Sequence, residues 1–140
     1  MEFTRIFEVL EHQLNNGSLE KSLSSKYNSK WVSISTKEFF DQSHKISKAL
    51  IELGIKSNDK IALISSTNRS EWSIIDMGIL QIGAINVPLY PTITSKDYEY
   101  ILNHSECKYC FVSDIEVLNK IKPIKNKVKS LKEIFSFDQI

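Results

Sequence analysis

Polar side chains able to contact a ligand follow two short apolar runs of this sequence. Asn68 and Arg69 come soon after the first run, and Tyr90 and Thr92 come soon after the second. An arginine guanidinium pairs well with a carboxylate or a phosphate, and a tyrosine ring can line the wall of a pocket. Parallel strands would place both loops at the edge of the sheet where α/β proteins bind ligands. We therefore predict Asn68, Arg69, Tyr90 and Thr92 as substrate-binding residues.

A purely structural role for the same segments stays open. Asn68 fits the N-cap position of a helix, with Glu71 three residues later as in a capping box. Arg69 could pair with a neighbouring acid, and Pro88 and Pro91 could shape a packing corner. Both roles are compatible with the sequence.

A second group of reactive side chains, His104, Cys107 and Cys110, has the spacing H-x-x-C-x-x-C. A structural zinc site needs four ligands, and the other histidines are far away in the sequence. A redox CxxC motif would follow a strand, whereas Cys110 begins an apolar run that we predict as a buried strand. We expect two reduced, partly buried thiols and no bound metal.

The common motifs for nucleotide binding and hydrolysis are absent. Glycine occurs only at positions 17, 54, 78 and 83, which excludes both G-x-G-x-x-G and G-x-x-x-x-G-K-[ST]. The sequence also lacks H-E-x-x-H and a nucleophile elbow. We therefore predict no catalytic residue in this chain and no cradle for the phosphates of ATP.

Six lysines crowd the segment 120–132 and could contact phosphate groups. They are Lys120, Lys122, Lys125, Lys127, Lys129 and Lys132. Nucleic-acid-binding segments usually interleave arginine and aromatic residues, and this segment has neither. We interpret the lysines as a solvated face.

Four apolar, β-branched runs alternate with segments of helical periodicity. The runs are 60–65, 84–87, 108–113 and 131–137. The first run is nearly continuous, which predicts a strand buried on both faces. Parallel strands need crossover connections, and the helices supply them. This alternation predicts an α/β fold, with a doubly wound, mainly parallel sheet flanked by helices.

The helix between the first two runs has a defined apolar stripe. Trp72 shares that stripe with Ile75 and Ile79, so we predict that Trp72 is buried. Gly83 follows where this helix should end, and Pro88 should end the next strand.

The first part of the chain predicts a helix and a hairpin. Apolar residues at helical spacing indicate a helix over residues 1–17, and Asn28-Ser29-Lys30 is typical of the turn in a hairpin over residues 18–35. Ser35 and Glu38 form a capping box that should start the next helix. Similar cap signals occur at Thr94 and Asp114. Residues 36–140 are then expected to form the α/β lobe.

Composition excludes several classes of partner. The 140 residues are 41% hydrophobic and 25% charged, with 18 basic against 17 acidic side chains. A net charge of +1 gives no field that would attract nucleic acid. No secretory signal and no transmembrane segment are apparent, so we expect a cytoplasmic protein, with peripheral membrane contact left open.

Several longer runs resemble one enzyme family. NRSEW (68–72) and DMGILQIGAINVPLYPT (76–92) are similar to the early part of the AMP-forming acyl-CoA synthetases. The similarity extends through KWVSISTKEFFD (30–41), DYEYILNHSE (97–106) and FVSD (111–114), and it is strongest to the long-chain fatty-acid branch. The family's TSGTTGxPKG phosphate loop and later motifs are absent.

The resemblance implies the N-terminal portion of a long-chain fatty-acid CoA ligase, within the adenylate-forming superfamily. The complete enzyme would use ATP and Mg²⁺ to convert a fatty acid to acyl-AMP and would then transfer the acyl group to CoA. On this interpretation residues 1–140 are a single partial domain whose C-terminal remainder is absent. The chain alone should be inactive, should hold no cofactor tightly, and should self-associate through apolar surface left uncovered.

Two other interpretations are compatible with the resemblance. One is a related adenylate-forming ligase for a different carboxylic acid, because most of the acyl pocket would lie beyond residue 140. The other is a non-catalytic binding or assembly module that uses the same lobe.

Overall fold

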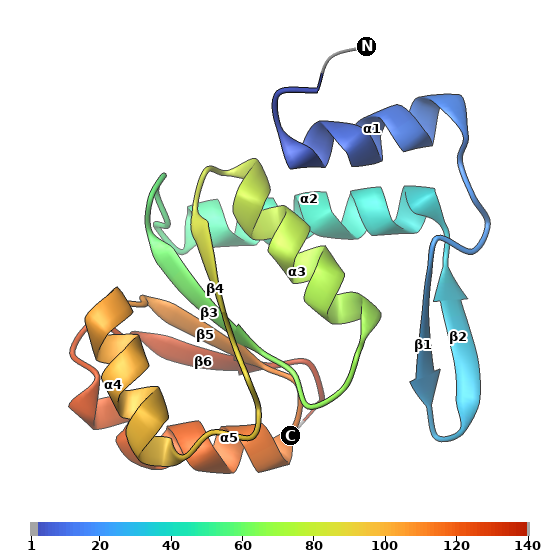
Figure 1. Cartoon of the computed structure of the whole chain (residues 1–140). Coiled ribbons are helices and arrows are strands. Elements are labelled where there is room, and N and C mark those ends of the chain that lie inside the picture. Colours follow the sequence, from blue (N-terminus) through green and yellow to red (C-terminus); the bar gives the residue numbers. More distant parts are fainter. Residues whose placement is uncertain (1–2, 140) are drawn as a thin grey trace. The chain divides into compact units, whose positions relative to one another are not determined.

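The chain, drawn in Figure 1, divides into two compact units. The computed structural model describes residues 3–139. The first unit contains the chain up to Lys56 and the segment Asn68–Gly83, and the second contains Ser57–Thr67 and the chain from Ala84 onward. Residues 1, 2 and 140 lie outside the described part, so the helix predicted over residues 1–17 can be compared only from Phe3.

Four parallel strands form the sheet of the second unit, in the order β4-β3-β5-β6. They are β3 (Lys60–Ile64), β4 (Ile85–Leu89), β5 (Tyr109–Val112) and β6 (Glu133–Ser136). After β3 the chain adds β4 on one side and then crosses to add β5 on the other side. This reversal is the mark of a doubly wound sheet. The predicted α/β class and the parallel sheet are confirmed.

The central strand β3 is buried except at its first residue, Lys60. Ile61, Ala62, Leu63 and Ile64 are each 0% exposed, so both faces of the strand are covered as the sequence predicts. The strand also has a hydrogen-bonded neighbour on each side, β4 and β5. Its position is therefore fixed both by packing and by two ladders.

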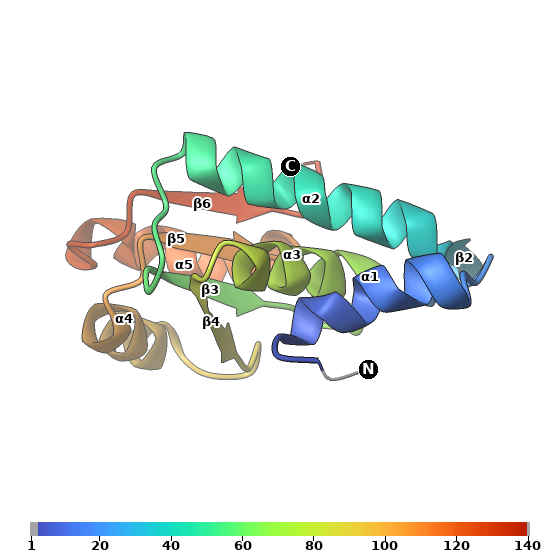
Figure 2. The same cartoon turned by 90° about the horizontal axis from the view of Figure 1, so that it is seen from above.

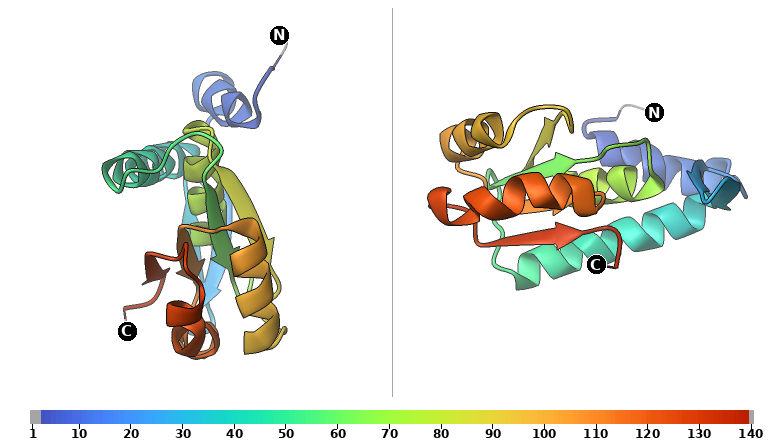
Figure 3. Two further views of the ribbon diagram at one scale, coloured as in Figure 1. Left: turned by 90° about the vertical axis from the view of Figure 1, so that its left-hand side faces the viewer. Right: turned by 90° about the horizontal axis from the view of Figure 1, so that it is seen from below.

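Three helical segments cover one face of this sheet. They are α4 (Ser95–Ser105), α5 (Ile115–Ile121) and the 3₁₀ helix η1 (Lys122–Lys127). Tyr98 and Leu102 of α4 and Val117 of α5 share one apolar cluster with Ala62 and Cys110 of the strands. Figure 3 shows α4 and α5 lying beside each other.

The second strand of the sheet continues past the predicted end. Pro88 lies inside β4, which runs on to Leu89, so the prediction that Pro88 ends the strand is wrong. The reason is that β4 is an edge strand of the described sheet. A proline has no N–H to donate, and an edge strand tolerates this on its unpaired side.

The first unit contains three helices and a hairpin. The elements are α1 (Ile6–Asn16), β1 (Leu23–Tyr27), β2 (Lys30–Ile34), α2 (Thr36–Glu52) and α3 (Ser70–Gln81). Figure 2 shows α1, α2 and α3 lying against one another. Leu10, Phe39 and Ile74, one from each helix, form the buried centre of this packing. The predicted N-terminal helix and hairpin are both present.

Local sequence signals place the ends of these elements. Asn28 and Ser29 have φ of 48° and 65°, and Tyr27 pairs with Lys30. This is a two-residue turn with both central residues at positive φ, as a type I′ hairpin requires. Ser35 and Glu38 form the predicted capping box, and Glu38 donates its N–H to Ser35 Oγ at 3.1 Å.

The helices α2 and α3 approach each other very closely at Gly78. A Cβ at this position would lie 2.6 Å from Ile46 Cγ2 and 3.0 Å from the carbonyl oxygen of Ser43. The facing positions on α2 include the buried serines Ser43 and Ser47, and Ser47 Oγ donates to the Gly78 carbonyl at 3.0 Å. Small side chains on both helices therefore permit the close contact.

The prediction that Trp72 is buried is wrong, because its side chain is only partly buried. The buried face of α3 includes Ile74 and Gly78. At about 100° per residue, the buried residues of α3 span roughly half of the helix circumference, from Ser70 to Ile79. Trp72 lies about 20° beyond Ile79, at the edge of this buried face, so its side chain is only partly covered.

The close helix contact predicts the effect of adding one methyl group. Gly78→Ala should improve helix propensity by about 1 kcal/mol, yet we expect a net loss of about 1–3 kcal/mol in the free energy of unfolding because Ile46 or the helix must move. Gly17→Ala is the control, since nothing lies within 4 Å of a Cβ there. Urea unfolding of both variants measures the difference. Equal stability of Gly78→Ala and the unchanged chain would contradict the close packing.

Candidate functional site

The strand order of the second unit identifies the edge where a ligand is expected. Open α/β sheets bind ligands at the carboxyl ends of strands, where the winding direction reverses. In this sheet the reversal lies between β3 and its two neighbours, β4 and β5. The loops at this edge are residues 65–67 after β3, 90–92 after β4, and 113–114 after β5.

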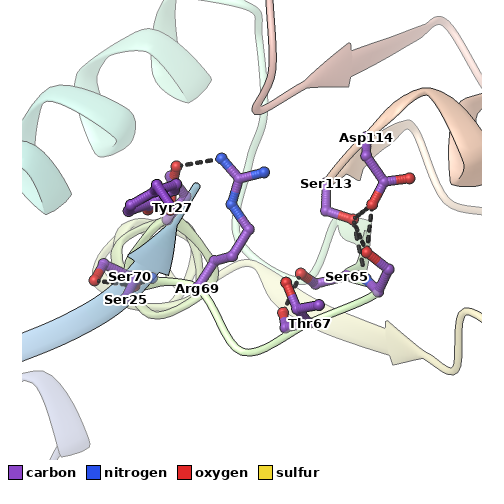
Figure 4. A network of polar contacts seen from close by, with 10 residues as sticks. Ser25, Tyr27, Ser65, Thr67, Arg69, Ser70, Ser113 and Asp114 are labelled. Atoms are coloured by element: carbon purple, nitrogen blue, oxygen red, sulfur yellow. Dashed lines mark hydrogen bonds and ion pairs between the residues drawn. The ribbon is translucent and has the colours of Figure 1, made fainter. Parts of the chain in front are cut away.

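Hydroxyl groups and one carboxylate join the loops after β3 and β5. The Ser66 N–H donates to Ser113 Oγ at 2.9 Å, and Ser113 Oγ donates to Asp114 Oδ2 at 2.6 Å. Ser66 Oγ also donates to Asp114 Oδ2. Figure 4 shows Ser113 and Asp114 converging on the loop that begins at Ser65. This network fixes the ends of two neighbouring strands.

Asp114 is charged at neutral pH. Partial burial raises the pKa of its carboxyl, but hydrogen bonds from Ser113, Ser66 and backbone N–H groups lower that pKa further, so the net shift is downward. Its Oδ1 also accepts the Val117 N–H at 3.0 Å, which confirms the predicted cap of α5. Because its pKa is lowered, the Asp114 carboxylate is a weak base for either serine, and its hydrogen bonds hold the two loops together.

The loop after β4 has a fixed backbone and exposed side chains. Tyr98 donates its hydroxyl to the Tyr90 carbonyl at 2.7 Å, and Lys120 Nζ donates to the Pro91 carbonyl at 2.6 Å. Burial raises the pKa of Tyr98 to about 12, so this donor stays protonated. The Tyr90 side chain is 79% exposed and Thr92 is exposed as well. A rigid loop thus presents a free aromatic ring.

The other two predicted site residues belong to the first unit. Asn68 is exposed, whereas the Arg69 side chain is only 12% exposed and donates to Glu71 Oε1 at 2.6 Å. The Arg69 guanidinium also lies over the Tyr27 ring, 5.2 Å from its centroid. Tyr27 donates its hydroxyl to Glu71 Oε2 at 2.6 Å. Arg69 therefore has the neighbouring acid that its structural role requires, and a role in ligand binding stays a prediction.

The charge state of this group follows from its contacts. Partial burial raises the pKa of Glu71, but hydrogen bonds from Arg69 and Tyr27 outweigh it and lower the pKa overall. Burial, together with the bond to Glu71, raises the pKa of Tyr27. At neutral pH the carboxylate is ionised and the phenol is protonated, so both bonds to Glu71 are charge-assisted.

The helix α3 begins with a cap that sequence reasoning missed. Asn68 is not the N-cap, because that position is occupied by Arg69, whose side chain makes no capping bond. Instead Ser25 of β1 accepts the Ser70 N–H at 2.7 Å, and the Ser25 and Ser70 hydroxyls are 2.7 Å apart (Figure 4). Ser25 is 45 residues away in sequence, so no local pattern could have identified it.

The structure thus brings Asn68 and Arg69 together at the start of α3, and it places Tyr90 and Thr92 together after β4. Each pair lies in a different unit. Sequence reasoning missed the group formed by Ser66, Ser113 and Asp114, because its importance depends on the strand order.

The cysteine and histidine cluster divides between surface and core. His104 stacks on Tyr100 along α4 with centroids 5.8 Å apart, and Tyr100 is exposed. Cys107 and Cys110 are free and buried, and burial raises the pKa of both thiols. Within residues 3–139, no group of three or more His, Cys, Asp or Glu side chains could hold a metal ion. None of the helices described there has the length and apolarity to cross a bilayer.

Comparison with known proteins gives one consistent family. The AMP-binding enzyme family matches residues 11–140. Fatty acyl-CoA synthetase A of Dictyostelium discoideum is 32% identical over 111 residues, covering 79% of this chain and 16% of that protein. Long-chain-fatty-acid–CoA ligase FadD15 of Mycobacterium tuberculosis is 29% identical over 104 residues, covering 74% and 17%. This chain therefore spans about a sixth of the length of these relatives.

Solved structures with the same fold include a CoA ligase and an isolated N-terminal domain. The N-terminal domain of FACL13 from Mycobacterium tuberculosis superposes with a TM-score of 0.81 at 19% identity, covering 97% of this chain and 34% of that one. The anthranilate CoA ligase AuaEII, in complex with anthranoyl-AMP, gives a TM-score of 0.81 at 20% identity, covering 96% and 25%. At such identities the likeness establishes the fold.

Because Ser25 caps α3, removing its hydroxyl should destabilise a helix that begins 45 residues later in the sequence. Ser25→Ala removes the acceptor for the Ser70 N–H and should lower the free energy of unfolding by about 1–2 kcal/mol. Ser24→Ala is the matched control, because Ser24 is exposed and its hydroxyl lies within hydrogen-bond distance of Ser33 Oγ across the hairpin; its effect should stay within about 0.5 kcal/mol. Two variants of equal stability in urea would contradict the cap.

Asp114 predicts a difference in acid stability. Its pKa is lowered from the ordinary 3.8 on folding, so its contribution is complete above that value and disappears as pH falls through the lower, folded-state pKa. Asp114→Asn keeps a capping side chain but cannot titrate. The unchanged chain should therefore lose more stability than the variant between neutral pH and the acid range, as measured by urea midpoints. Parallel pH profiles would show that Asp114 has no stabilising charge interaction.

Proposed function

Since this chain belongs to the AMP-binding enzyme family, we propose that it forms the N-terminal lobe of an AMP-forming long-chain fatty-acid CoA ligase. The observation that carries the proposal is the family match over residues 11–140. The substrate class is supported by relatives named as fatty-acid CoA ligases, which include proteins from bacteria, an amoeba and vertebrates.

The proposed reaction has two steps. A fatty-acid carboxylate oxygen attacks the α-phosphorus of ATP, and pyrophosphate leaves with Mg²⁺ to balance its charge. The CoA thiolate then attacks the acyl carbon of the acyl-AMP, and AMP leaves. Both steps develop negative charge on phosphate oxygens, which an enzyme stabilises with preorganised donors or cations.

The lobe is suited to support this chemistry from outside the reacting atoms. The loops after β3 and β5 present an ionised Asp114, which would repel a triphosphate instead of binding it. The two serines beside it donate to that carboxylate and so are already engaged. We therefore assign binding of the ATP phosphates to parts of the enzyme beyond these residues, and to this chain the role of scaffold.

Within this proposal, the loop after β4 is the best candidate for contact with substrate. Its backbone is held by Tyr98 and Lys120, while the Tyr90 ring is exposed and free to lie against an acyl chain or a CoA group. Thr92 is exposed next to it. Asn68 and Arg69 stay in the proposal as secondary candidates, because the Arg69 side chain is committed to Glu71.

The remaining parts of the proposal concern location and assembly. We propose a cytoplasmic enzyme with peripheral membrane contact, organised as residues 1–17, 18–35 and 36–140. Self-association of the isolated chain is supported by exposed apolar side chains on the hairpin, where Trp31 is 71% and Val32 49% exposed.

Pyrophosphate release tests the proposed division of labour. With ATP, Mg²⁺, CoA and a long-chain fatty acid, the 140-residue chain should release no pyrophosphate above background, because it lacks the phosphate loop. The product of the complete reading frame that contains this sequence should release it, and more with a long-chain acid than with an aromatic acid. A preference for the aromatic acid would favour the alternative ligase. No release with any acid would favour a non-catalytic module, and release by the 140-residue chain would refute the scaffold role.

A further inference from the structure

The amino edge of the sheet carries an unusual row of like charges. Lys60 begins β3, and Lys108 and Lys132 immediately precede β5 and β6. The Lys108 N–H donates to the Lys60 carbonyl at 2.9 Å, and the Lys132 N–H donates to the Lys108 carbonyl at 2.8 Å. The three lysines therefore lie side by side on neighbouring strands, one residue before the paired positions of the ladders.

Such a row is electrostatically unfavourable by itself. Like charges directly opposite each other on neighbouring strands destabilise a sheet. Neighbouring strands are about 4.8 Å apart, so the row spans roughly 10 Å. Of the three lysines, Lys108 is the one with an ion-pair partner among residues 3–139: its Nζ lies 2.7 Å from Asp59 Oδ2. The Lys132 ammonium lies 5.9 Å from the Tyr109 ring centroid. An anion between the lysines would relieve the repulsion.

A cavity of about 580 Å³ lies at this row. It is lined by the three lysines and by Lys129, together with Asp59, Asn103, Glu106 and Ser130. Four ammonium groups against two carboxylates leave an excess of two positive charges in the lining. The volume is within the range of about 300–1,000 Å³ that small-molecule sites occupy.

A buried hydroxyl supplies an independent indication of a ligand. Ser130 is one of the residues that line this cavity, and its Oγ is buried without a hydrogen-bond partner in the described part of the chain. A buried hydroxyl without a partner costs free energy, and a ligand oxygen in the cavity could accept from it. Ser130 lies next to Lys129, so both could contact one anionic group.

The lysine-rich segment 120–132 is thereby divided into two parts. Lys120, Lys125 and Lys127 are engaged with the Pro91 carbonyl, Glu133 and Glu99. Lys129 and Lys132 instead line the cavity, where Lys60 and Lys108 arrive from strands distant in sequence. The interpretation of the whole segment as a solvated face does not account for this convergence.

We propose that the cavity at the amino edge of the sheet binds a soluble oligophosphate, a small molecule carrying several adjacent phosphate groups. Spacing decides the class: a row of ammonium groups spanning roughly 10 Å matches several linked anionic groups better than a single phosphate ion. Rotation of the Ser130 side chain about its Cα–Cβ bond would turn its hydroxyl toward one of the phosphate oxygens. The proposal is independent of the proposed ligase activity, because the cavity lies at the amino edge of the sheet, whereas the loops that carry Asp114 and Tyr90 lie at the carboxyl edge.

The test is an NMR titration of the 140-residue chain with sodium tripolyphosphate and with orthophosphate, at constant ionic strength and without Mg²⁺. Tripolyphosphate should shift the backbone amide signals of Lys60, Lys108 and Lys132 saturably and bind at least about tenfold more tightly than orthophosphate. Failure to saturate at millimolar concentration would overturn the proposal.

Charge variants distinguish binding of tripolyphosphate in the cavity from a general attraction of this anion to surface lysines. Lys129→Gln combined with Lys132→Gln should weaken tripolyphosphate binding about tenfold or more. The control combines Lys45→Gln with Lys122→Gln, which removes the same charge from exposed positions outside the cavity and should change affinity less than about twofold, because surface charges at a distance are screened. Equal weakening by both pairs would overturn the proposal.

Two further arms complete the test. Glu106→Gln removes a carboxylate from the lining and should tighten binding, and an unchanged or weaker affinity would contradict the site. Vesicles containing phosphatidic acid distinguish a lipid headgroup from a soluble ligand. Vesicle binding that depends on Lys129 and Lys132, without a response to tripolyphosphate, would assign the surface to a membrane and overturn the proposal.

Discussion

The burial of β3 beyond its first residue is the constraint on which the second unit depends. Four successive residues, Ile61 to Ile64, have no exposure, and the strand pairs with a neighbour on each side. Burial at roughly 1.5–3 kcal/mol for each large apolar side chain makes any other position of this strand unfavourable. Because both neighbours run parallel to β3, each connection must run back along a face of the sheet before the next strand begins. The amino ends of the strands therefore lie at one edge of the sheet and the carboxyl ends at the other. One edge receives Ser66, Ser113 and Asp114, and the other receives the lysine row.

These two edges differ in charge and therefore in what they can do. The carboxyl edge is held by an ionised Asp114 that accepts from two serines, and it suits a scaffold more than a phosphate site. The amino edge has an excess of positive charge around a cavity. In the first unit a comparable role falls to Ser25, whose hydroxyl fixes the start of α3 and thereby the position of Arg69 and Glu71. In each unit a serine hydroxyl accepts a backbone N–H: Ser113 holds the loop after β3, and Ser25 holds the start of α3.

Much of the fold could be predicted from the sequence, because the deciding interactions are local. The hairpin turn at Asn28 and Ser29, the capping box at Ser35 and the cap at Asp114 involve residues at most four apart. The strands follow from short β-branched runs. The candidate site could be predicted only in part, since its loops follow from strand ends, whereas the meeting of Ser66 with Ser113 requires the strand order. The cap from Ser25 and the contact at Gly78 join segments distant in sequence. The partial burial of Trp72 reflects its place at the edge of the buried face of α3.

The dependence of the second unit on β3 is tested most directly by native-state hydrogen exchange. If β3 is the central constraint, the amides of Ala62, Leu63 and Ile64 should exchange only through global unfolding, with the same free energy as the urea-induced transition. Amides in the loop after β4 should exchange through smaller, local openings. Exchange of the β3 amides at the rate of that loop, well below the free energy of global unfolding, would contradict the account.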